Sequence, residues 1–211
     1  MKKNYEMDMC SGPILGKLLT FTIPLIFSGI LQLLFNAADV IVVGRFAGSQ
    51  SLAAVGSTTA LINLMINIFI GLSVGVNVIV ARYYGAKREK DVQDTIHTAM
   101  ALSIVSGLFL IIVGQLLSRP MLELMGTPDD VIDKSTIYMR IIFIGMPANM
   151  IYNFGSAILR AVGDTKRPLY FLTAAGVINV VLNLFFVIMF QMDVAGVALA
   201  TAISQAISAC L

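Results

Sequence analysis

Asp39 is the residue whose position most needs a chemical explanation, because it lies inside an apolar run that covers residues 18–43. A carboxylate at the centre of a membrane helix costs about 2.5–3.5 kcal/mol on insertion scales, so intramembrane acids usually have a function. A buried carboxyl group without a partner favours its neutral form, whereas a bound cation favours the charged form. Asp39 is therefore predicted to exchange charge partners, with a proton, a bound cation and a substrate ammonium group as the candidates.

A structural role for Asp39 is the alternative. An arginine or a helix N-terminus would satisfy the carboxylate permanently, and Arg45 and Arg140 are expected on the same side of the membrane as Asp39. A carboxylate clamped by a guanidinium group would join helices without exchanging ligands. The positions of these two arginines relative to Asp39 distinguish the two roles.

Polar stripes accompany Asp39 on five of the expected helices. At 100° per residue, Gln32 and Asn36 fall on one arc with Asp39. Such residues often only hydrogen-bond neighbouring helices together. Because several stripes are built from Asn or Gln, a shared polar cavity is favoured, and its predicted lining residues are Gln32, Asn36, Asn63, Asn67, Asn149 and Asn153. Other polar positions on these arcs are Ser28, Thr59, Asn77, Ser156, Arg160, Asn179, Asn183, Thr201, Ser204, Gln205 and Ser208.

The composition places these stripes in a membrane protein. Of the 211 residues, 58% are hydrophobic and only 12% are charged, whereas a soluble domain carries about 25% charged residues. About 20 mostly apolar residues make a helix long enough to cross the hydrocarbon layer. The sequence therefore predicts an all-α membrane fold of six transmembrane helices, at residues 18–43, 52–80, 96–118, 135–159, 168–190 and 194–211.

The distribution of Lys and Arg predicts the orientation. Alternate connections between the expected helices are rich in basic residues, and such connections face the cytoplasm. The basic side carries Lys2, Lys3, Lys17, Arg82, Lys87, Arg88, Lys90, Arg160, Lys166 and Arg167. The other side carries Arg45, Arg119 and Lys134, with Arg140 just inside the fourth helix. A cytoplasmic N-terminus and a multi-pass location in the cell (plasma or inner) membrane are expected.

Two prolines fall inside expected helices, Pro24 in the first and Pro147 in the fourth. A proline in a helix interior removes one backbone hydrogen bond and favours a kink. Kinks serve as hinges in transporters but are also static features of membrane helices. Pro24 is the predicted hinge.

Several chemistries are not supported by the sequence. It has one histidine, two distant cysteines and no cluster of metal-ligating residues, so no metal site is expected. No phosphate-binding glycine motif and no catalytic constellation is visible, so neither an enzyme nor a bound cofactor is expected. The short basic loops suit anionic lipid headgroups in the bilayer, and no nucleic-acid partner is expected.

Taken together, four segments resemble the multidrug and toxic compound extrusion (MATE) transporters, specifically their N-terminal six-helix lobe. The segments are "IPLIFSGILQLLFNAADVIVVGRFAGSQSLAAVG", "ARYYGAKREKD", "ILRAVGDTKRPL" and "VAGVALATAIS", in this order across nearly the whole chain. The resemblance implies secondary active transport, in which organic cations or drugs leave the cell by antiport with H⁺ or Na⁺ through alternating access.

The resemblance also implies a cation site. In the family, that site takes an Asp from the first helix, two positions four residues apart on the fifth helix and a Thr on the sixth. Here these residues are Asp39, Asn179, Asn183 and Thr201. Carboxylate, amide and hydroxyl oxygens suit a hard cation. Whether the site takes H⁺, Na⁺ or both in turn is left open, because some branches of the family carry Asp at the position of Asn183.

Family members have two six-helix lobes, and this sequence corresponds to one of them, residues 1–211. We expect the chain to be a fragment, or else to pair with a second copy; in either case the expected partner is a second six-helix lobe. Two other functions are kept as alternatives. A lipid-linked saccharide flippase of the same superfamily would need several Arg or Lys residues within its helices, and only Arg140 qualifies. A non-transporting membrane scaffold or subunit would not need Asp39.

Overall fold

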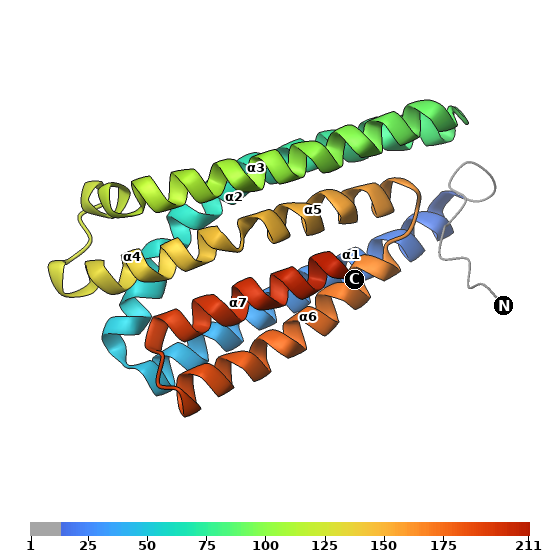
Figure 1. Cartoon of the computed structure of the whole chain (residues 1–211). Coiled ribbons are helices and arrows are strands. Elements are labelled where there is room, and N and C mark those ends of the chain that lie inside the picture. The colour runs from blue at the N-terminus through green and yellow to red at the C-terminus, as the bar shows by residue number, and fades with distance from the viewer. Residues whose placement is uncertain (1–13) are drawn as a thin grey trace.

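Residues 14–211 are described by the structure, a computed structural model in which every regular element is a helix (Figure 1). In chain order they are α1 (Ile14–Val42), η1 (Val43–Ala47), α2 (Ser49–Gly85), α3 (Glu89–Leu124), α4 (Asp129–Ile144), α5 (Met146–Ala161), α6 (Lys166–Leu184), η2 (Phe185–Met189) and α7 (Asp193–Cys210). The all-helical prediction is confirmed. Lys2, Lys3 and Cys10 lie outside the described residues.

The helices have the length and composition of membrane spans. Five helices in the described part of the chain are long and apolar enough to cross a bilayer, counting each π-helical segment with the helix that it continues. The pair α4 and α5, which is bent by 48°, passes the same test when taken together and makes a sixth span if it is counted as one. Each of the six runs predicted from the sequence thus corresponds to one helix or to this bent pair.

The helices extend further than the apolar runs that predicted them. The third run, at residues 96–118, corresponds to α3, which begins at Glu89 and ends at Leu124. Its first turn carries Glu89 and Asp91, whose negative charges interact favourably with the positive end of the helix dipole. Hydropathy identifies only the part of a helix inside the hydrocarbon, so polar turns at both ends are missed.

The sharp bend lies at Gly145, two residues before Pro147, and not at Pro24. Pro147 occupies the first turn of α5, where its missing N–H leaves no intrahelical bond unmade. Pro24 lies within the continuous helix α1, and its carbonyl accepts a hydrogen bond from the Ser28 hydroxyl at 2.9 Å. A hinge at Pro24 therefore stays a prediction, while the break at Gly145 divides the fourth span.

The spans run alternately up and down, so that the connections gather at two ends (Figure 1). The α2–α3 and α5–α6 connections lie at the end where α1 begins. These are the basic connections found in the sequence, including Arg82, Lys87, Lys166 and Arg167. Their common location is consistent with the predicted orientation, which remains a prediction.

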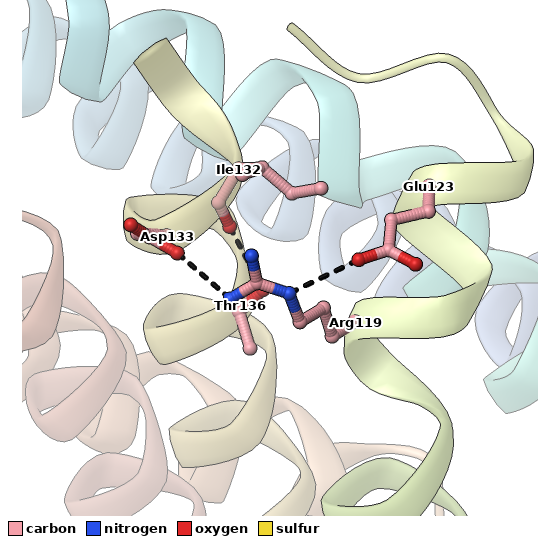
Figure 2. A network of polar contacts seen from close by, with 5 residues as sticks. All are labelled: Arg119, Glu123, Ile132, Asp133 and Thr136. Atoms are coloured by element: carbon pink, nitrogen blue, oxygen red, sulfur yellow. Dashed lines mark hydrogen bonds and ion pairs between the residues drawn. The ribbon is translucent and has the colours of Figure 1, made fainter. Parts of the chain in front are cut away.

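Polar contacts tie the helices together at the opposite end. Arg119 on α3 binds Glu123 of its own helix and Asp133 of α4, each at 3.0 Å (Figure 2). All three side chains are exposed, so water screens these ion pairs. A more sheltered tie joins Lys134 of α4 to Asp193 at the start of α7, at 2.7 Å. The Lys134 ammonium also donates to the Ser51 hydroxyl of α2 at 3.1 Å, so three helices meet there.

Two glycines of α3 let it pack closely against the bent span. A Cβ on Gly107 would lie 2.4 Å from the Cα of Pro147, and one on Gly114 would lie 2.1 Å from the Phe143 ring. Small residues at such contacts allow membrane helices to approach closely and gain dispersion energy. The face of α3 that meets α4 and α5 therefore depends on the absence of these side chains.

Gly107→Ala is expected to destabilise the fold, because its new methyl group meets the Pro147 backbone, which cannot rotate away. The expected loss is about 1–3 kcal/mol of the free energy of unfolding, the range for overpacked sites. Gly71→Ala is the control, since a Cβ there meets nothing within 4 Å. Denaturant unfolding in detergent micelles measures both variants, and equal stabilities would contradict this packing.

Candidate functional site

A polar cavity of about 310 Å³ lies between α1, α2, α5, α6 and α7. This volume is at the lower limit for small-molecule sites, which are about 300–1,000 Å³. The described residues that line it are Gln32, Phe35, Asn36, Asp39, Asn63, Ile66, Asn67, Ile70, Asn149, Tyr152, Asn153, Leu172, Ala175, Gly176, Asn179, Thr201, Ser204, Gln205 and Ser208. Five helices thus contribute to one compartment.

The residues predicted to line a cavity converge on this compartment. The lining includes all six of them, namely Gln32, Asn36, Asn63, Asn67, Asn149 and Asn153. Three residues of the expected cation site, Asp39, Asn179 and Thr201, also line it. Asn183 lies beside Asp39 and is fully buried, whereas Pro24 is not among the lining residues.

The four residues of the expected cation site form one hydrogen-bonded chain. The Asn183 amide donates to the Asp39 carboxylate and to the Asn179 carbonyl oxygen, the latter at 3.2 Å. The Asn179 amide donates to the Thr201 hydroxyl at 3.3 Å, and that hydroxyl donates to the Val197 carbonyl at 3.0 Å. These hydrogen bonds connect α1, α6 and α7. A change in the hydrogen bonding of Asp39 therefore affects contacts between all three helices.

One oxygen in this chain lacks a partner. The side-chain oxygen of Asn183, Oδ1, is buried and accepts no hydrogen bond. A buried polar atom left in this state costs free energy, usually about 1–3 kcal/mol. This oxygen belongs to the residue that contacts Asp39, so an unsatisfied hydrogen-bond acceptor lies beside the carboxyl group.

Neither candidate arginine clamps Asp39. Within residues 14–211 there is no ion pair between Asp39 and Arg45 or Arg140, and both arginines are exposed. Asp39 is also the only acidic side chain among the described lining residues, and none of them is basic. The cavity therefore holds one carboxyl group without a basic side chain opposite it among the described lining residues.

Two π-helical segments follow the site. η1 begins at Val43, four residues after Asp39, and η2 begins at Phe185, two residues after Asn183. Short π-helical turns inside α-helices are rare and often occur at functional sites. Both elements that carry the Asp39–Asn183 contact thus leave α-helical geometry directly beyond it.

Three residues of the polar stripes, Ser28, Thr59 and Asn77, do not line the cavity. The Asn77 amide donates to the Ala157 carbonyl at 2.7 Å and so ties α2 to α5. The Ser28 and Thr59 hydroxyls donate to carbonyls of their own helices, Pro24 and Val55. Asn77 therefore fits the interpretation of the stripes as helix contacts, whereas Ser28 and Thr59 satisfy their hydroxyls within their own helices.

Two features of the site lay outside the predicted residues. Gly176 of α6 approaches Phe35 of α1 so closely that a Cβ would lie 1.9 Å from the ring. This contact brings α1 against α6 next to Asp39. Tyr152 lines the cavity and donates to the Pro168 carbonyl at 3.2 Å. Gly176 and Tyr152 border polar stripes in the sequence, but only the packing shows what they contact.

The sequence matches the family model described as MatE over residues 24–185. The chain belongs to the MatE family. The predicted family resemblance is therefore confirmed, and with it the membership in a family of multi-pass membrane proteins.

Curated relatives of this MatE chain are named as multidrug resistance proteins or as transporters. The probable multidrug resistance proteins YoeA and YpnP of Bacillus subtilis are 35% and 31% identical to it, over 162 and 201 residues. The FAD transporter of Shewanella oneidensis is 27% identical. The alignments cover 77%, 95% and 93% of this chain but only 35%, 45% and 44% of these relatives. The chain thus spans less than half of their length.

Solved transporters share the fold of this MatE chain. One described as a MOP superfamily transporter from Pyrococcus furiosus, with a binding pocket of reverse polarity, matches with a TM-score of 0.87 and 27% identity. Another, described as an outward-facing multidrug resistance MATE family transporter, gives the same values. Each match covers 92% of this chain and 43% of the solved one. The chain therefore has the fold of one lobe of these transporters.

Cysteines placed at Asn36 and Asn67 are expected to react with a membrane-impermeant methanethiosulfonate reagent, because both side chains are exposed in the cavity. The background is Cys10→Ser with Cys210→Ser, so that no native thiol competes. Leu110→Cys, at a fully buried position, is the control and should stay unlabelled. Labelling of the purified protein, followed by mass spectrometry, tests access of water to the cavity. Unreactive cysteines at both cavity positions would contradict it.

Proposed function

We propose that this chain is the cation-binding lobe of a transporter that exports organic cations, including drugs, in exchange for H⁺ or Na⁺. The observation that carries the proposal is a single acid, Asp39, in a polar cavity without a basic side chain among its described lining residues. Such a cavity attracts cations and disfavours anions. Ion and substrate then compete for one negative charge.

The exchange follows from the contacts of Asp39. When a proton or Na⁺ neutralises the carboxylate, its attraction for a cationic substrate is lost and the substrate leaves. When the ion departs, the charge is again available. Because the Asn183 amide links Asp39 to α6 and α7, ion binding also changes the hydrogen bonds between these helices. Alternating access requires such a difference between the two states, since equal binding shifts no equilibrium.

Asn179, Asn183 and Thr201 are the proposed ion ligands beside Asp39. They supply amide and hydroxyl oxygens, which together with a carboxylate suit Na⁺. With Asn at position 183, Asp39 is the only acid of the site, which also permits a one-proton exchange. A second six-helix lobe, from a longer chain or another copy, completes the transport path in this proposal.

A lipid-linked saccharide flippase is less consistent with the cavity. Pyrophosphate recognition needs cationic side chains, and Arg140, the intramembrane arginine seen in the sequence, is not among the lining residues. The names of relatives include an FAD transporter, so anionic cargo occurs among similar proteins. In this chain the charge of the cavity favours cationic cargo.

Asp39→Asn is expected to abolish ion-coupled export while leaving membrane insertion intact, because it removes the charge for which ion and substrate compete. The change is made at the natural gene locus, so that any second lobe is retained. Ethidium accumulation, with and without an uncoupler, is the measurement. Asp133→Asn, which removes an exposed carboxylate far from the cavity, is the control. Unchanged export by the Asp39 variant would refute the assignment.

A further inference from the structure

We propose that exposed amide side chains on α1 and α2 recognise a substrate group that carries a hydrogen-bond donor and an acceptor side by side, such as a carboxamide. The four residues, which form the amide wall of the cavity, are Gln32, Asn36, Asn63 and Asn67. The inference rests on the proposed transport of organic cations. It narrows the substrate class to cations that bear such a group.

The amide wall can be reached from the cavity. All four of its side chains line the cavity and are exposed, whereas Asn179 and Asn183 of the proposed ion site are buried. α1 packs mainly against α6, while α2 packs mainly against α3, α4 and α5. The wall therefore has two parts, on helices with different neighbours, and both parts open into the same cavity.

The four amides make no hydrogen bond within residues 14–211. Their depth makes this notable, since Asn67 stands midway between Ser49 and Gly85, the two ends of α2. At the centre of a membrane helix, an amide that faces lipid without a hydrogen-bond partner costs free energy. The wall therefore needs water or a bound molecule in the cavity as its partner.

A carboxamide matches the chemistry of the wall. Each amide side chain presents two N–H donors and one carbonyl acceptor, so it can make two hydrogen bonds at once to a group with an adjacent acceptor and donor. Asn and Gln bind the edge of adenine in this bidentate way. An ammonium group only donates hydrogen bonds and engages only the carbonyl side of each amide. The wall therefore favours a cation whose second polar group is a carboxamide or a similar edge.

The wall adjoins both the acid and apolar lining. On each of its two helices the amides are four residues apart, so they share one helix face with about 5–6 Å between their Cβ atoms. Asn36 lies three residues before Asp39 and thus on the same side of α1. Phe35 and Ile66 also line the cavity and offer apolar surface to a ring. One aromatic cation can therefore direct its charge towards Asp39 and its carboxamide towards the wall.

Two matched probes test the wall. 1-Benzyl-3-carbamoylpyridinium and 1-benzyl-3-methylpyridinium have the same ring system and charge, and only the first carries a carboxamide. Their affinities are measured by equilibrium dialysis on the full-length product of the natural gene in lipid nanodiscs, so that any second lobe is retained. The test variant is Asn63→Leu with Asn67→Leu. The control is Gln50→Leu with Gln93→Leu, which removes two exposed amides outside the cavity.

The proposal expects the wild type to bind the carbamoyl probe about tenfold more tightly than the methyl probe, the effect of one or two additional hydrogen bonds. The test variant should lose this preference and still bind the methyl probe, which also shows that it is folded. The control variant should keep the preference. A wild type that binds both probes equally, or a test variant that keeps the tenfold preference, would overturn the amide wall. The first result is expected if the amides bind only water.

Asp39→Asn separates this result from the proposed function. Loss of both probes in that variant supports cation binding at Asp39, whatever the preference of the α2 variant. If Asp39→Asn binds both probes normally while the α2 variant loses the preference for the carboxamide, the amide wall stands and the proposed function falls.

Discussion

Placing the Asp39 carboxyl group within the membrane costs free energy, and the arrangement of the helices around it depends on offsetting that cost. The protein meets that cost with the Asn183 amide and leaves the two candidate arginines elsewhere. An amide carries no positive charge, unlike a guanidinium group, so this partner does not permanently neutralise Asp39. A permanently neutralised acid would be stable but would have nothing to exchange.

Close helix contacts at glycines position the polar side chains around Asp39. Gly176 lets α6 approach Phe35 of α1, and this contact holds Asn183 next to Asp39. On the other side of the cavity, Gly107 and Gly114 let α3 support the bent α4–α5 pair. That pair carries Asn149 and Asn153 into the lining. Close contacts at glycines thus position polar side chains that apolar packing alone would not bring together.

The sequence predicted which helix faces are polar better than it predicted the hydrogen-bond partners of the residues on those faces. Periodicity placed Asn63 and Asn67 on a polar face of the second helix, and the structure has both in the cavity. Asn77 lies on the same arc but bonds to the Ala157 carbonyl, because helical periodicity does not say where a neighbouring helix crosses. The sequence predicted that a kink is favoured at Pro24 and at Pro147, but not that the sharp break would lie beside Pro147, at Gly145, because the surrounding packing decides how far a proline site bends. The unpartnered side-chain oxygen of Asn183 could not be predicted at all, because every neighbour must be known before a partner is known to be missing.

The central claim is that the Asp39 carboxyl group itself exchanges ligands. Difference infrared spectroscopy of the chain in nanodiscs, before and after addition of an organic cation or Na⁺, observes this group directly. The account predicts a carboxyl or carboxylate signal that changes on addition and is absent from Asp39→Asn. An identical difference spectrum in wild type and variant would contradict it.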